Sequence, residues 1–160
     1  MNRIPRIVEL KPKYLIGISQ QMSLVDNTTF ELWKSFRKRS TEITNRLSDD
    51  FISLQYYPEE YFKDFNPSTK FIKWACVEVD EAENIPVSMN SLLLVGGLFA
   101  VFDHKGSSSA QDIFQYIYGE WIPSSKYQLD DGPHFEVLGA KYKNNDPTSE
   151  EEIWIPIRFK

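Results

Sequence analysis

The chain has 160 residues, 41% apolar and 26% charged, which is enough for one domain with its own hydrophobic core. Its 18 basic and 23 acidic side chains give a net charge of −5, which disfavours nucleic acid as a direct partner because phosphate neutralisation supplies most of that affinity. No apolar run approaches the roughly 20 residues of a membrane-spanning helix, and the N-terminus lacks the apolar stretch of an export signal.

The first half of the chain reads as a strand, a helix and two further strands. Residues 14–19 are strand-like, and a capping box at 28–31 starts an apolar stripe with helical spacing that we expect to continue to residue 48. Strand-like segments at 51–57 and 71–79 follow, with a polar, proline-containing loop between them. This half therefore has the order β-α-β-β.

The second half shows the same order. A strand is expected at 98–103, and a shorter helix begins at a serine cap within 107–109 and is stopped by Pro123. Strands at 134–138 and 152–159 complete the unit. Antiparallel pairing with a helix on one face of each unit predicts an α+β fold.

An internal repeat supports this division. The segment 66–69, which begins Asn-Pro and is followed by Trp74, recurs 80 positions later as the segment 146–149, which begins Asp-Pro and is followed by Trp154. We therefore interpret residues 1–160 as a single domain made of two repeats, at about 4–80 and 92–159.

Alternation along the strands assigns side chains to faces of the sheet. In the last strand Trp154 points away from the aliphatic, helix-covered side, and Trp74 does the same in the first half. We take Phe135 and Val137 as core-facing, which would leave Glu136 on the face of Trp154. The pattern thus predicts a lone acid that faces aromatic side chains.

Several segments of the second half resemble a known family. They are 97–106, 116–123 with Tyr127, 132–137 and the closing strand 152–157, and together they are similar to the GyrI-like small-molecule-binding domain. That domain also serves as the effector-binding part of AraC-type and MerR-type multidrug regulators. The resemblance implies two β-α-β-β units about a pseudo-twofold axis with a central ligand cleft. Because the two units use all 160 residues, we expect the stand-alone form without a DNA-binding domain.

The resemblance also implies which residues form the site. The family's acidic residue corresponds to Glu136, at the floor of a cleft walled by aromatic side chains. Trp74 and Trp154 are candidate wall residues because symmetric positions meet across a twofold axis, although plain core packing remains the alternative for them. The remaining candidates for ligand contact are Trp121, Tyr116, Tyr127 and Tyr57.

Three functions remain open at this point. A glutamate among aromatic rings could attract a lipophilic organic cation as its counter-ion. It could instead act as a general base in a hydrolase that detoxifies reactive electrophiles, with Glu136 as the catalytic residue and His134 relaying the proton. One branch of the family implies a third function, protein inhibition of a topoisomerase.

The metal-ligating and nucleophilic residue types are scarce. The chain has one cysteine, Cys76, and two histidines, His104 and His134, which supports neither a zinc site nor a catalytic triad. We therefore expect no metal and no cofactor. A single cysteine inside an apolar strand fits a reducing compartment, and we expect a cytoplasmic protein.

Overall fold

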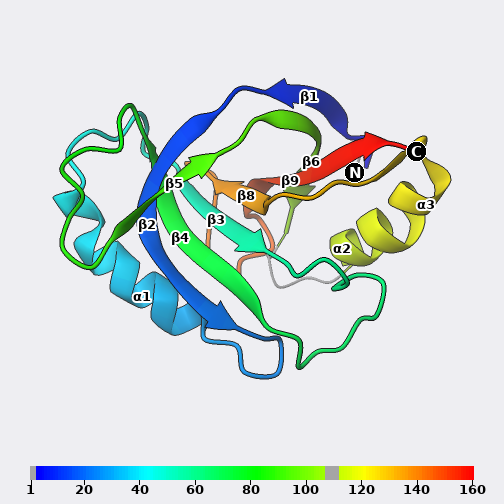
Figure 1. Ribbon diagram of the computed structural model, residues 1–160, viewed down its shortest axis with the longest axis horizontal. Helices are drawn as coiled ribbons and strands as arrows, with labels where there is room; N and C mark the ends of the chain where they lie inside the picture. The colour runs from blue at the N-terminus through cyan, green and yellow to red at the C-terminus, as the bar shows by residue number, and fades with distance from the viewer. Residues whose placement is uncertain (1–2, 107–111) are drawn as a thin grey trace.

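The computed structural model describes residues 3–106 and 112–160, which form one strongly curved, nine-stranded antiparallel sheet with helices (Figure 1). The strand order is β1-β6-β9-β8-β3-β4-β2-β5, and β7 pairs with β9. The strands are β1 (Arg6–Leu10), β2 (Lys13–Met22), β3 (Phe51–Tyr56), β4 (Phe71–Val79), β5 (Asn90–Leu94), β6 (Gly97–Lys105), β7 (Tyr127–Leu129), β8 (His134–Leu138) and β9 (Glu150–Phe159). The helical elements are α1 (Thr29–Arg39), the short 3-10 helix η1 (Ser40–Glu42), α2 (Asp112–Tyr116), the π-helical turn η2 (Ile117–Trp121) and α3 (Ile122–Ser124).

The strand order has a twofold pattern. In the first half β2, β4 and β3 lie side by side, and in the second half β6, β9 and β8 do the same in the equivalent order. The halves meet where β3 pairs with β8, in a register that runs from Phe51 opposite Leu138 to Gln55 opposite His134. The expected α+β class and antiparallel pairing are confirmed.

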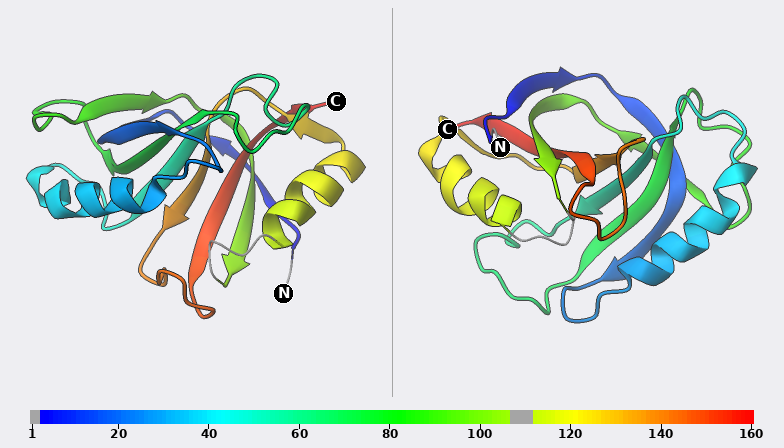
Figure 2. Two further views of the ribbon diagram at one scale, coloured as in Figure 1. Left: turned by 90° about the horizontal axis from the view of Figure 1, so that it is seen from below. Right: turned by 180° about the vertical axis from the view of Figure 1, so that it is seen from behind.

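Both helical segments cover the same face of the sheet, at opposite ends (Figure 2). Under α1, the buried side chains of Leu32 and Phe36 belong to one apolar cluster with Ala75 and Val77 of β4. Under the second segment, Ile113 and Ile117 pack in another cluster that includes Ile153, Ile155 and Ile157 of β9. The central strands β3 and β8 lie between these two helix-covered clusters.

On the opposite face of the sheet, which is also apolar, no helix of residues 3–106 or 112–160 lies (Figure 2). A third cluster there includes Leu15, Leu54, Cys76, Leu94 and Phe99, all buried. Apolar side chains therefore line both faces of the central strands.

Some expected boundaries differ from the structure. The first helix ends at Arg39 rather than at 48, because Ile43 takes an extended conformation (ψ 114°) and Arg46 forms a β-bridge to Val79. Pro123 does not stop the second segment but lies in the first turn of α3, where a missing N–H is tolerated. The serine cap expected at 107–109 lies outside the described residues.

Within residues 3–106 and 112–160, no helix is long and apolar enough to cross a bilayer.

Candidate functional site

Glu136 lies at the centre of the sheet and on the helix-covered face. In the pairing of β8 with β9, Glu136 stands opposite Ile153, whereas Phe135 stands opposite Trp154. The expectation that Glu136 shares a face with Trp154 is therefore wrong. The two-residue alternation along the strand is correct, but the face assigned to Phe135 is not. Apolar side chains cover both faces of the sheet, and Phe135 packs on the helix-free face.

We call the group of side chains around this glutamate the Glu136 site. Its members come from the helix-covered face of the four central strands, from the segment after β3 and from η2. They are Ser53, Gln55, Tyr57, Phe62, Lys73, Tyr118, His134, Glu136 and Glu151.

A second acid lies beside Glu136. The Glu151 side chain is buried, with 5% of its surface exposed, and neither of its carboxylate oxygens has a hydrogen-bond donor among the described residues. Burial, followed by the nearby Glu136 carboxyl group, raises the pKa of Glu151 well above its ordinary value. A protonated Glu151 can donate a hydrogen bond to the Glu136 carboxylate, so the pair is best satisfied with one shared proton.

A lysine reaches the same acids from the first half of the sheet. Burial lowers the pKa of Lys73, and attraction to Glu136 and Glu151 opposes that effect. Lys73 lies on β4 opposite Gln55 of β3, and Gln55 in turn lies opposite His134 of β8. Both halves of the fold therefore contribute charged groups to one site.

Stacked rings lie over the two central strands. The Phe62 ring is stacked against Tyr118, with centroids 4.7 Å apart and planes at 26°, and against His134, at 5.2 Å and 19°. Tyr57 meets His134 edge to face at 5.0 Å. The place expected to be a central cleft is thus occupied here by the protein's own Phe62 ring.

The ionisable groups of these rings, the imidazole of His134 and the phenols of Tyr118 and Tyr57, are neutral near pH 7. Burial lowers the pKa of His134 to about 3. Burial raises the pKa of Tyr118, and nearby Tyr57, Glu136 and Tyr61 raise it further. Burial likewise raises the pKa of Tyr57, reinforced by Tyr61 and Glu136. The Tyr118 hydroxyl oxygen lies 2.8 Å from Nδ1 of His134, so a phenol and a neutral imidazole share a hydrogen bond beside Glu136.

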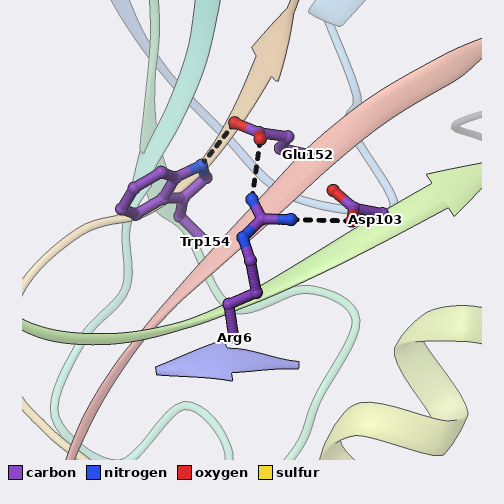
Figure 3. A network of polar contacts seen from close by, with 4 residues as sticks. All are labelled: Arg6, Asp103, Glu152 and Trp154. Carbon is purple, nitrogen blue, oxygen red and sulfur yellow. Dashed lines mark hydrogen bonds and ion pairs between the residues drawn. The ribbon is translucent and has the colours of Figure 1, made fainter. Parts of the chain in front are cut away.

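Two of the three candidate tryptophans, Trp74 and Trp154, lie on the helix-free face. Trp154 stacks on Phe135 at 5.2 Å, and its indole N–H donates a 3.2 Å hydrogen bond to Glu152 (Figure 3). The same Glu152 carboxylate accepts a 2.8 Å bond from Arg6, which also binds Asp103 at 2.7 Å. Trp74 belongs to the same helix-free cluster. The structure therefore does not bring either tryptophan to Glu136.

Three further candidates lie under or beside the second helical segment. Trp121 stacks on the buried Tyr127 at 6.0 Å and meets Phe102 edge to face at 5.3 Å. The guanidinium of Arg3 lies 5.2 Å from the Tyr116 ring centroid. Of the seven residues expected to form the site, the structure brings together Glu136 and Tyr57.

Other members of the site were missed in the sequence. Two of them carried a usable signal: Lys73 alternates with the apolar residues of one face of its strand, and Glu151 continues the alternating series of Ile153 and Ile155 onto the helix-covered face. Phe62 and Tyr118 carried none, because a loop and an irregular helical turn have no fixed periodicity.

Two hollows open away from the stacked rings. One of about 160 Å³ lies on the helix-free face and is lined in part by Phe135 and Trp154. The other, about 990 Å³, is lined by Glu151, its neighbours in β9 and residues of β6. Glu151 lines the larger hollow and also belongs to the Glu136 site, so this hollow reaches one end of the site.

Comparisons with known proteins agree with this architecture. A sequence model described as the GyrI-like small molecule binding domain matches residues 4–158. The transcriptional regulator BrlR of Pseudomonas aeruginosa is 27% identical over 158 residues, which cover 98% of this chain and 56% of that protein. The chain thus spans about half the length of this curated relative.

Solved structures have the same fold at low identity. The C-terminal domain of EcmrR superposes with a TM-score of 0.74 at 14% identity, covering 100% of both chains. SAV2435 bound to tetraphenylphosphonium gives a TM-score of 0.70 at 14% identity, covering 96% of this chain and 93% of that one.

Proposed function

The chain belongs to the GyrI-like family of small-molecule-binding domains, and from that premise we propose that it binds a lipophilic, cationic aromatic compound at the Glu136 site. The observation that carries the proposal is the pairing of the half-buried Glu136 with the buried Glu151 near the stacked rings of Phe62 and His134. Lys73 can balance one of the two carboxylates, and a hydrophobic cation would supply a counter-charge for the other together with apolar surface.

The preference for an aromatic ligand rests on Phe62. This side chain comes from the segment between β3 and β4, and its ring stacks over the neighbouring rings of Tyr118 and His134. A planar ring of a ligand could take its place with the same stacking geometry. Displacing Phe62 would cost only the contacts that the ligand ring restores.

Tetraphenylphosphonium is a suitable probe. It is bound in the structure of SAV2435, whose fold this chain shares, and it combines a permanent charge with phenyl rings. Triphenylphosphine oxide offers similar rings without a net charge. We infer that the protein binds the cation in preference to this neutral compound.

The decisive variant is Glu136→Gln, which keeps the shape of the side chain and removes its charge. Loss of a desolvated charged contact should weaken tetraphenylphosphonium binding by about 1 to 3 kcal/mol, and binding of the neutral oxide should change little. The matched control is Glu152→Gln, which alters an acid of the neighbouring strand β9 on the helix-free face. Equal affinities of Glu136→Gln and the unaltered protein, measured by calorimetry, would reject the proposal.

A second candidate function is hydrolysis of reactive electrophiles. It is favoured by the Tyr118 and His134 hydrogen bond beside Glu136, because a phenol could polarise a substrate while Glu136 acts as general base on water. In that case Glu136→Gln should retain binding but lose about 10² to 10⁴ of the rate. If a panel of electrophiles is recovered intact after incubation with the protein, hydrolysis is rejected and binding remains as the function.

The biological setting is part of the same proposal. We infer a cytoplasmic protein from the buried, unpaired Cys76. Its partner is the small molecule, and the net charge of −5 argues against direct contact with DNA. BrlR is a transcriptional regulator, and an effector-binding role is the part of that activity that this chain could share.

A further inference from the structure

The charge of the Glu136 site depends on how many protons its acids keep. Glu136 from β8 and Glu151 from β9 contribute two carboxyl groups, and Lys73 from β4 contributes one ammonium group. With both acids ionised the site carries one net negative charge, whereas with one proton retained it is neutral. Buried sites favour the neutral state because each uncompensated charge loses its hydration.

The surroundings of Glu151 favour a proton on this acid when no ligand is bound. Both oxygens of Glu151 are buried without a donor in the described part of the chain, so an ionised Glu151 would have no hydrogen bond. Protonation removes that charge and provides a donor toward Glu136. Without a ligand, we therefore expect the two acids to keep one proton, held on the Glu151 side, and Lys73 to balance the remaining negative charge.

A monovalent cation added to this neutral site would leave one positive charge in excess. We propose that the bound cation takes the place of the proton held between Glu136 and Glu151, so that each binding event releases one proton, and that Lys73 limits the site to one added positive charge. This inference rests on the proposed function and specifies the charge of its ligand. The O–H bond of Glu151 breaks, the proton passes to the buffer, and the ligand's charge balances the second carboxylate.

Other titratable groups face the pair. Tyr57 and Tyr118 are phenols whose raised pKa keeps them protonated, and His134 is neutral both before and after binding. From β6, the buried His104 stands opposite Glu151 in the strand register. A His104→Gln variant is therefore the control for a proton that comes from a neighbour rather than from the acid pair.

Calorimetry tests the exchange directly. Tetraphenylphosphonium has no ionisable proton, so titrating it at one pH in two buffers of different ionisation enthalpy counts the protons that the protein releases. We expect about one proton per cation for the unaltered protein and for His104→Gln, and none for Glu151→Gln. Affinity should rise up to about tenfold per pH unit around neutrality, but be flat in Glu151→Gln. Cation binding without proton release, or the same proton release in Glu151→Gln as in the unaltered protein, would refute the proposed exchange of a proton for the cation.

The Lys73→Met variant tests the charge limit. The control is Lys70→Met, because Lys70 is an exposed lysine three residues earlier in the chain. The probes are tetraphenylphosphonium and benzyl viologen, an aromatic dication. Removing the Lys73 charge makes room for a second positive charge, so the ratio of dication to monocation affinity should rise by about tenfold or more. The same ratio in both lysine variants would refute the role of Lys73.

A ligand-free measurement separates this inference from the proposed function. The carboxyl carbon of Glu151, assigned by its loss in Glu151→Gln, can be titrated by nuclear magnetic resonance. We expect it to stay protonated through pH 7, and an ionised Glu151 at that pH would overturn the inference even if cations bind. If Glu151 is protonated but neither the unaltered protein nor Lys73→Met binds either probe, then the proposed function fails instead, and the exchange fails with it.

Discussion

The hydroxyl oxygen of Tyr118 lies 2.8 Å from Nδ1 of the buried His134, and this contact joins the second helical segment to the central strand β8. The Phe62 ring stacks on both of these neighbouring rings, so one hydrogen bond holds together the aromatic surface on which Phe62 lies. Because burial lowers the pKa of His134 to about 3, the bond joins neutral partners over the whole physiological pH range.

The first prediction concerns stability at acidic pH. The unfolded chain protonates His134 near pH 6.5, but the folded protein does so only near 3, so acid favours unfolding below about 6.5. His134→Gln lacks this linkage. The free energy of unfolding of the unaltered protein, relative to that of the variant, should fall by about 2 kcal/mol between pH 7 and pH 5. Urea unfolding at the two pH values measures it, and a constant difference would contradict a neutral buried His134.

Glu151 gives a linkage of the opposite sign. Its folded pKa is raised, so the unfolded chain releases the proton at lower pH than the folded protein does, and stability is lost as pH rises above about 4.5. Glu151→Gln should therefore be more stable than the unaltered protein. The difference in the free energy of unfolding between Glu151→Gln and the unaltered protein should grow by up to about 1.4 kcal/mol per pH unit between pH 5 and pH 7. If urea unfolding gives an advantage that does not change with pH, Glu151 is not protonated in the folded state.

Phe62→Ala should strengthen binding of aromatic cations. The ligand ring would no longer compete with Phe62 for the surface of the Tyr118 and His134 rings, which should improve the affinity for tetraphenylphosphonium by about 0.5 to 1.5 kcal/mol. Phe65→Ala is the matched control, because Phe65 lies in the same segment but is 60% exposed. Tetrabutylammonium, which has no ring, should gain less. Weaker tetraphenylphosphonium binding in Phe62→Ala would mean that Phe62 contacts the ligand rather than replacing it.

Trp154→Ala should separate stability from binding. Trp154 stacks on Phe135 and contributes to the helix-free cluster, so its removal should lower the free energy of unfolding by about 2 kcal/mol or more. Affinity for tetraphenylphosphonium, measured well below the unfolding transition, should be unchanged. A loss of affinity comparable to that of Glu136→Gln would move the ligand to the helix-free face, where the hollow of about 160 Å³ lies.

Local patterns were sufficient for much of the fold. The strands expected at 71–79 and 134–138 match β4 and β8 in both bounds, because strand alternation and flanking turn residues are local signals. The short strands β1, β5 and β7 were not expected. Each has only three to five residues, and what makes it a strand is a partner that lies far away in the sequence.

The site was harder to predict than the fold. Alternation fixes which residues share a face, but it does not say which face a helix will cover when both are apolar, and this reversed the side assigned to Glu136. Trp121 and Tyr127 were plausible by type, yet they fill the space under the second helical segment. The partners of Glu136 come from four strands and two irregular segments, and only the folded sheet brings Lys73 and Glu151 together.

The edge strands have a consequence for the integrity of the chain. β1 lies at the start of the first unit but pairs with β6 of the second, whereas β5 leads into the second unit but pairs with β2 of the first. Together with the β3 and β8 ladder, these pairings cross from one side of residues 80–89 to the other. A proteolytic nick within 80–89 would therefore leave two fragments that complement each other as a non-covalent complex, each supplying an edge strand to its partner's sheet.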